Sequence, residues 1–325
     1  MNIILNFIEG TDHESLLQRV NFENLSGPLS IDMGRVPFVH PATLSLLYSV
    51  FKLHSILYPD QERKFIPADL KSEDTDVNRY MQRADFFKCC SEFKKFETGG
   101  FRRHDSSGRF VPISEVHSMK DTDSVAEKIV KVIFSRTKIS GEEQVKYALT
   151  ELMDNALQHS ESRIGCIAQT QLYQEKYVEG VILDLGIGIR NHLSRNKNLV
   201  SQFASDKDAI KLALQPYVSG AAFRGRPNIQ EQFQGYHNEG LGLSACKELM
   251  KRSGGFLQVF SGKSGITVTR QGISDIQIAG LPGTLIVFRM NCQELTNIPD
   301  IIKEFDKLNP KRDNLSEGYK GPEFV

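Results

Sequence analysis

Hydrophobic residues in the second half of the chain recur with two different periods. Over residues 125–133 and 145–156, apolar side chains lie three or four positions apart, which predicts helices that each pack on one side. Shorter apolar runs bounded by polar turns predict strands at 164–172, 178–183, 256–260, 266–269 and 285–290. The polar residues 261–265 are predicted to be one of those turns. Hairpin-spaced strands with helices indicate an α+β sandwich, in which a mixed or antiparallel sheet carries helices on one face.

The first hundred residues follow a different pattern, in which predicted strands and helices alternate. Strands are predicted at 2–7, 29–33 and 64–68, and helices at 12–22 and 42–57, with residues 74–90 continuing the alternation. This order predicts a small α/β domain. We therefore expect four segments: an α/β domain at 1–97, a glycine-rich polar linker at 98–117, a second domain at 118–293, and a short helix with a mobile tail at 294–325.

Three polar residues lie four positions apart on a predicted helix: Glu151, Asn155 and His159. Residues at this spacing share one helix face, so the three side chains can converge on one ligand. An amide oxygen such as that of Asn155 can join a hydrated Mg²⁺, and Glu151 can take a proton from an attacking water or hydroxyl. The alternative is an amphipathic helix whose polar side only meets solvent.

Asp184 ends the strand predicted at 178–183, and Gly186 and Gly188 follow it. A carboxylate buried at this point needs a hydrogen-bond partner, and the exocyclic amine of adenine is a suitable one. The glycines permit a tight turn and let the backbone approach a flat base closely. The alternative is an ordinary turn after a strand.

Gly240 and Gly242 precede a helix predicted at 243–250. Glycines that open a helix present free backbone N–H groups and the positive end of the helix dipole, which suits a polyphosphate. An ordinary glycine-rich turn is the alternative for this motif taken alone.

Together these motifs resemble the ATPase superfamily shared by gyrase, Hsp90-type chaperones, histidine kinases and MutL, over residues 118–293. The resemblance implies a Bergerat-type ATP-binding sandwich with ATP and Mg²⁺ as cofactors. Glu151 and Asn155 match the first motif, which implies Glu151 as the catalytic general base and Asn155 as the metal ligand. His159 is expected to contact the nucleotide from the same helix face.

The remaining motifs of this superfamily are also matched. Asp184 is implied as the adenine contact, with Gly186, Gly188 and Ile189 beside the nucleotide. The resemblance implies that four residues lie around the phosphates: Asn238, Gly240, Leu241 and Gly242. It implies that Thr284 reaches adenine through water. Asn238 stands where the superfamily usually has a glycine.

Two features favour a particular branch of the superfamily. Histidine kinases generally have an amide at the position of Glu151, whereas the hydrolases and the anti-sigma-factor serine kinases have an acid there. The anti-sigma-factor kinases also carry a histidine after the asparagine, as His159 does here. The chain is therefore most similar in pattern to those kinases.

The amino-terminal residues 29–44 resemble the STAS fold of anti-anti-sigma factors. His40, Pro41 and Ala42 stand where the acid and the phosphorylatable serine of that fold are expected, so we expect no phosphoacceptor here. A generic α/β domain is the alternative. Either interpretation leaves a protein partner in trans, and a homodimer stays open.

A long segment, residues 190–238, separates the second and third motifs. It contains a helix predicted around 207–214, and a connection of this length in a compact domain favours a lid over the nucleotide. Arg224 and Arg226 could reach the γ-phosphate from it, although loop arginines are more often only solvated.

Composition excludes some classes of function. The chain has 40 basic and 40 acidic residues, so its formal charge of zero gives no reason to expect general nucleic-acid or anionic-membrane binding. Five cysteines without metal-ligand spacing suggest reduced thiols, and no apolar run of about 18 residues indicates a membrane span. We expect a cytoplasmic protein.

Two classes of function remain open from the sequence. In the first, the protein hydrolyses ATP or transfers its γ-phosphate to a protein hydroxyl, in a regulatory or signalling role. In the second, it is a nucleotide-gated interaction module with little or no turnover. Glu151 favours the first class.

Overall fold

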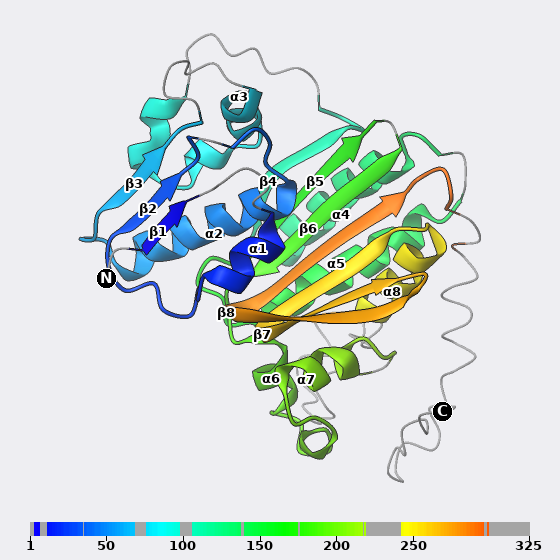
Figure 1. The fold of residues 1–325 in the computed structure, drawn as a ribbon. Coiled ribbons are helices and arrows are strands. Elements are labelled where there is room, and N and C mark those ends of the chain that lie inside the picture. Colours follow the sequence, from blue (N-terminus) through cyan, green and yellow to red (C-terminus); the bar gives the residue numbers. More distant parts are fainter. Residues whose placement is uncertain are drawn as a thin grey trace.

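The computed structural model describes most of the chain as two sheets with their helices (Figure 1). The described residues are 3–6, 12–34, 36–68, 76–97, 106–137, 140–174, 176–216, 218, 242–295 and 298. The strands are β1 (Ile3–Asn6), β2 (Leu29–Asp32), β3 (Arg63–Ile66), β4 (Phe110–Val116), β5 (Cys166–Tyr173), β6 (Tyr177–Asp184), β7 (Phe256–Thr269) and β8 (Gly272–Asn291). The α-helices are α1 (His13–Arg19), α2 (Pro41–Leu57), α3 (Asp76–Arg83), α4 (Met119–Phe134), α5 (Glu142–His159), α6 (Gly188–Leu193), α7 (Asp206–Ala213) and α8 (Gly242–Arg252). Three 3₁₀ helices, η1 (Phe86–Lys88), η2 (Ser91–Phe96) and η3 (Val200–Gln202), complete the described elements.

The larger sheet has five strands in the order β4-β5-β6-β8-β7, and every neighbouring pair is antiparallel. Helices α4, α5 and α8 cover one of its faces (Figure 1). Their apolar stripes form a buried core with that face, to which Leu149, Ile182 and Leu249 belong. The predicted α+β sandwich with an antiparallel sheet is thus confirmed.

The smaller sheet is formed by β1, β2 and β3, which pair in parallel in that order. Helix α2 is buried around almost its whole circumference, and its buried residues include small polar ones such as Ser45 and Ser49. It contacts β5 and β6 of the larger sheet, and α1 contacts β8. The amino-terminal helices therefore cover the second face of the larger sheet (Figure 1).

The two sheets share one hydrophobic core. The same buried cluster contains Leu47 and Phe51 of α2 together with Val181 and Leu183 of β6. Because β6 is covered on both faces, seven of its eight residues, all but the first, are buried. This explains why its sequence is a continuous apolar run rather than an alternating one.

Polar contacts also join the amino-terminal helices to the larger sheet. The Ser45 hydroxyl donates to Gln169 Oε1 over 2.8 Å, in a buried position. The Tyr48 hydroxyl donates to the Glu115 carboxylate over 2.5 Å, and Lys52 pairs with the same carboxylate. Burial raises the pKa of Glu115, but the hydrogen bonds from Lys52, Tyr48 and His117 outweigh it and hold this pKa at about 2.

Two segments differ from the predictions. Residues 110–116, within the stretch expected to be a linker, form β4 at the edge of the larger sheet. Residues 261–265, predicted as a turn, lie within β7 and pair with β8 through two register shifts. The serines and glycines there fit local irregularities of a paired strand, and Gly262 takes a φ of 60°.

Several predictions fall wholly or partly outside the described residues. The linker at 98–105, Arg224 and Arg226, and all of the carboxyl-terminal segment beyond Leu295 except Ile298 are in this group. Within the predicted lid segment, the described part contains α6, η3 and α7. Helix α7 confirms the helix predicted around 207–214, and its amino terminus is fixed by a reciprocal capping box between Ser205 and Asp208.

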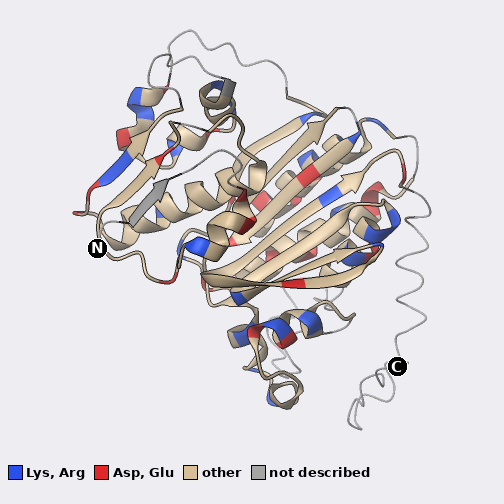
Figure 2. Cartoon of the chain, viewed as in Figure 1, with Lys and Arg blue, Asp and Glu red and all other residues tan. Residues whose placement is uncertain are grey.

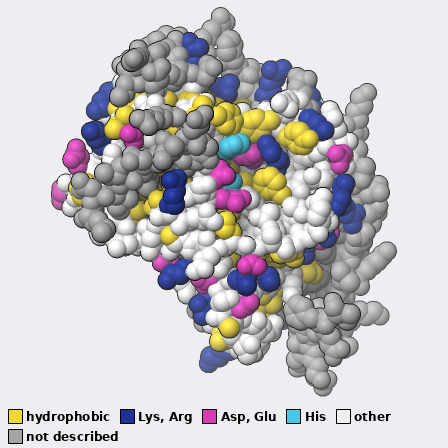
Figure 3. Space-filling view, in the orientation of Figure 1, with side chains coloured by type: hydrophobic (Ala, Val, Ile, Leu, Met, Phe, Trp, Pro, Cys, Tyr) yellow, Lys and Arg dark blue, Asp and Glu magenta, His cyan; other side chains and the backbone are white. Residues whose placement is uncertain are grey.

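Basic and acidic residues are interspersed along the described elements (Figure 2). The face drawn in Figure 3 shows the same mixture, with hydrophobic side chains between charged ones. Within the described part of the chain, no helix combines the length and apolar character that crossing a membrane requires.

Candidate nucleotide site

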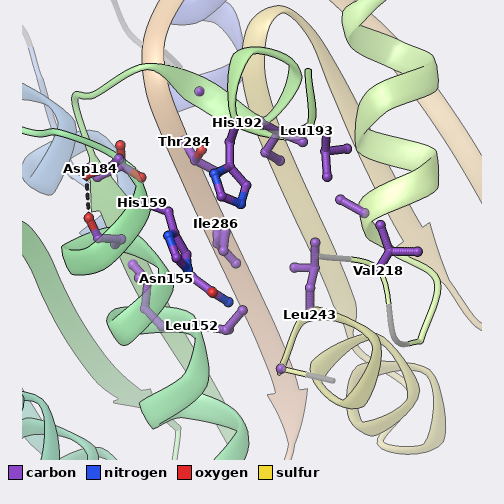
Figure 4. Close-up of a pocket in the computed structure, with 17 residues that line it drawn as sticks. Leu152, Asn155, His159, Asp184, His192, Leu193, Val218, Leu243, Thr284 and Ile286 are labelled. Atoms are coloured by element: carbon purple, nitrogen blue, oxygen red, sulfur yellow. Dashed lines mark hydrogen bonds between the residues drawn. The ribbon is translucent and has the colours of Figure 1, made fainter. Parts of the chain in front are cut away.

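A cavity lies between α5, α6, the start of α8 and the strands β6 and β8 (Figure 4). Its volume is about 120 Å³. Seven residues predicted for the nucleotide site line it: Asn155, His159, Asp184, Gly188, Ile189, Gly242 and Thr284. These residues come from five separate elements, so the fold brings together side chains that are up to 129 positions apart in sequence (155 to 284).

Helix α5 supplies the first part of the site. Its apolar face, which includes Val145 and Leu149, packs in the core under the sheet. Asn155 and His159, one turn apart, lie on the other face of α5, and both side chains point toward the cavity (Figure 4). The predicted convergence of this helix row on one cavity therefore holds for these two residues.

Glu151 lies one turn before Asn155 and is buried, with 3% of its surface exposed. It is not among the residues that line the cavity. Gly242, the first residue of α8, packs directly against it, since a Cβ on Gly242 would lie only 2.7 Å from the Glu151 Cβ. The start of α8 therefore packs against the side chain of Glu151, the residue expected to act as the base.

Asp184, at the end of β6, is the charged group at the other side of the cavity. The residue is 5% exposed, and its carboxylate accepts hydrogen bonds from the backbone N–H groups of Gly186, at 2.9 Å, and Thr284. Burial raises the pKa of Asp184 to about 7, although these two hydrogen bonds act to lower it. The carboxyl group keeps lone pairs to accept from a ligand amine.

Glycines are required at two points around Asp184 because backbone segments meet there. A Cβ on Gly186 would lie 1.9 Å from the carbonyl oxygen of Ser160. A Cβ on Gly283 would lie 2.2 Å from the carbonyl oxygen of Asp184, and Gly283 also has a φ of 84°. Gly186 is thus a packing residue beside the cavity rather than part of its lining.

Ser261 joins the two sides of this region. Its hydroxyl accepts from the Ile189 N–H at 3.0 Å and donates to the Gly283 carbonyl at 2.7 Å. The register shift in β7 begins at Ser261, and the side chain is buried. Sequence patterns do not predict this residue, because its segment has the composition of a polar turn.

The third motif is only partly within the described residues. Gly242 begins α8 and lines the cavity, so the positive end of an eleven-residue helix faces it. Asn238, Gly240 and Leu241 lie outside the described residues. Their predicted contacts with phosphate remain predictions.

His192 also lines the cavity without having been predicted from sequence. It lies on α6, four residues after Gly188, and its ring stacks on that of His159 with centroids 4.6 Å apart and planes at 28°. The helical spacing from Gly188 is the one signal that points to it, within a segment predicted only to be part of a lid. Burial, His159 and Arg195 together lower the pKa of His192 to about 4.

Comparison with known proteins agrees with this geometry. Residues 140–290 match the family model of the histidine kinase-, DNA gyrase B-, and HSP90-like ATPases. No match was found among curated proteins or among solved structures.

The family match and the sandwich fold assign residues 140–290 to the ATPase superfamily of gyrase, Hsp90-type chaperones, histidine kinases and MutL, abbreviated GHKL. This part of the chain is therefore a GHKL-type ATPase domain, and the domain supports ATP binding and a regulatory role of the ATPase or kinase kind. The prediction of the superfamily is confirmed, whereas the similarity to anti-sigma-factor kinases and the STAS-like character of residues 1–97 remain predictions.

Proposed function

We propose that this protein binds ATP with Mg²⁺ in the cavity between α5 and α6, and that it hydrolyses ATP or transfers its γ-phosphate to a protein partner. The observation that carries the proposal is the meeting of Asn155, Asp184, Gly242 and Thr284 around one cavity. Each of these residues offers the group that one part of the ligand requires, and the family match covers all four.

The adenine ring of ATP would be recognised at Asp184 and Thr284. An ionised Asp184 accepts a hydrogen bond from the adenine amine, and its backbone partners keep the carboxylate in place. The phosphates would lie toward Asn155 and the start of α8, where a side-chain oxygen and the positive end of the helix are available. Bound Mg²⁺ would supply charge neutralisation for the phosphates.

Glu151 is proposed as the general base, acting on water or on a hydroxyl of the partner. Because Glu151 is buried outside the cavity lining and Gly242 packs against its side chain, we propose that turnover requires the start of α8 to shift away from α5. The proposed catalytic state therefore differs from the described one at this contact.

A Glu151→Gln variant tests the role of this residue, since the change keeps the size of the buried side chain. With γ-labelled ATP and Mg²⁺, we expect the variant to bind ATP within about threefold of wild type while phosphate release or transfer falls by about 100-fold or more. Free phosphate would identify hydrolysis, and a labelled protein band in a lysate would identify transfer. Equal turnover in variant and wild type would contradict the assignment.

A second candidate is a nucleotide-gated interaction module with little or no turnover. The burial of Glu151 and its absence from the cavity lining favour it, because a base that stays buried outside the cavity cannot reach a nucleophile bound there. In that case ATP would alter the protein's contacts with a partner without being consumed. ATP binding in the absence of both free phosphate and labelled protein would support this candidate over the first.

We further propose that the amino-terminal unit is a STAS-like docking module and that the protein acts in the manner of the anti-sigma-factor kinases. Support comes from the succession of β2 and α2, with His40 and Pro41 at the start of the helix. A protein partner acting in trans, a cytoplasmic location and a homodimer belong to the same proposal. Co-purification with and without ATP is the corresponding test.

A further inference from the structure

Two histidines from different elements meet inside the nucleotide cavity. His159 ends α5, and His192 lies on α6, which follows the turn after Asp184. Their rings are stacked, with centroids 4.6 Å apart and planes at 28°. Figure 4 shows the pair between Asp184 and Thr284 on one side and Leu243, at the start of α8, on the other.

Each ring has a nitrogen that is buried without a hydrogen-bond partner among the described residues. These atoms are Nε2 of His159 and Nδ1 of His192. Burying a polar atom without a partner is costly, and most such atoms in folded proteins are satisfied. Since both residues line the cavity, a molecule bound there can provide the missing partners.

The protonation state of the two histidines determines which hydrogen-bonding groups that molecule needs. Burial lowers the pKa of His159, and the nearby charge of Arg195 lowers it further. Burial, the neighbouring ring and Arg195 act in the same direction on the pKa of His192. Both rings are therefore neutral near pH 7, and a neutral imidazole has one donor and one acceptor nitrogen. Hydroxyl groups, which both donate and accept, match such rings well.

The position of the two histidines along the cavity also indicates a ligand group that carries hydroxyls. With the base at Asp184 and Thr284 and the phosphates toward Asn155 and α8, the part of a nucleotide between them is the sugar. We propose that His159 and His192 form the ribose subsite of this cavity and hydrogen-bond the sugar hydroxyls through their unpartnered nitrogens. The inference rests on the proposed function, because it requires ATP to be the ligand.

Titration calorimetry with ATP, 2′-deoxy-ATP and 3′-deoxy-ATP tests the subsite. Wild type is expected to bind ATP about 3- to 10-fold more tightly than at least one deoxynucleotide, as for the loss of one hydrogen bond. His192→Phe keeps an aromatic ring for stacking but has no ring nitrogen. This variant should lose the preference for ATP over the deoxynucleotide that lacks the hydroxyl bound by His192.

Matched variants separate this role from a structural one. His117→Phe, at an exposed histidine outside the cavity lining, should keep the wild-type preference for ATP. If His192→Phe does not fold, His159→Phe tests the other ring and should lose the preference over the deoxynucleotide that lacks the hydroxyl bound by His159. Equal binding of all three nucleotides by wild type, or an unchanged preference in the folded variant, would overturn the ribose subsite.

The binding measurements distinguish a failure of the proposed function from a failure of the ribose subsite. If wild type binds no adenine nucleotide, the proposed function is overturned and the ribose subsite with it. If wild type binds ATP but the preference for the ribose hydroxyls is missing or insensitive to both histidines, only the ribose subsite is overturned.

Discussion

Replacing Asp184 by asparagine should stabilise the protein and weaken its binding of ATP at the same time. The carboxyl group is buried, and its pKa is raised from the ordinary value of 3.8 to about 7. At about 1.4 kcal/mol for each pKa unit, keeping this group ionised costs the folded state roughly 4 kcal/mol. Asparagine retains an oxygen that can accept from the N–H groups of Gly186 and Thr284, and it carries no charge.

The sign of the pH dependence follows from the raised pKa. The favourable contribution of protonated Asp184 is fully present below about pH 3.8 and is lost as the pH rises through about 7. At pH 8, the free energy of unfolding of Asp184→Asn should therefore exceed that of wild type by about 2–4 kcal/mol, whereas the difference should shrink near pH 5. Urea unfolding at the two pH values measures it.

ATP binding should change in the opposite direction. The amide nitrogen of asparagine is a donor and cannot accept from the adenine amine, so we expect affinity to fall by about 10- to 100-fold, measured by calorimetry at pH 8. Asp154→Asn is the matched control, because Asp154 is another buried carboxyl with a raised pKa but does not line the cavity. A destabilised Asp184→Asn protein, or one with wild-type affinity for ATP, would refute the reasoning.

Three further substitutions test the packing around the site. Asp154→Asn should raise the free energy of unfolding by about 1–2 kcal/mol at pH 8 and by less near pH 4, because burial raises the pKa of Asp154 to about 6; urea unfolding at both pH values checks this. Ser261→Ala should lower the free energy of unfolding by about 1–3 kcal/mol, because it removes the hydrogen bonds to Ile189 and Gly283. Calorimetry should also show weaker ATP binding by this variant. Ser253→Ala is the control, since the buried Ser253 hydroxyl donates to the Met250 carbonyl at the end of α8, and it should leave ATP binding unchanged. Gly283→Ala should lower the melting temperature by more than about 5 °C or prevent folding, because its Cβ would lie 2.2 Å from a backbone oxygen; thermal unfolding followed by circular dichroism gives the answer.

Local spacing is sufficient to predict the side of the site that α5 provides. A four-residue interval fixes a helix face, so the sequence alone places Asn155 and His159 together. Asp184 is predictable for a similar reason, because a single carboxylate followed by two glycines ends an apolar strand. In both cases the information lies within a few consecutive residues.

Contacts between distant segments are not predictable in the same way. Ser261 lies in a segment typical of a turn, and only its pairing with β8 places its hydroxyl between Ile189 and Gly283. His192 joins the cavity because α6 packs near the end of α5, which no local pattern specifies. The packing of Gly242 against Glu151 depends in the same manner on how α8 meets α5.

The amino-terminal helices give the larger sheet a property that its own sequence does not supply. Residues such as Val181, Leu183 and Val287 face α1 and α2 rather than water, within a single core that spans both parts of the chain. A fragment starting at residue 118 would leave this apolar surface bare and prone to self-association. The nucleotide-binding half thus depends for its solubility on the segment that precedes it, and removing that segment is no neutral truncation.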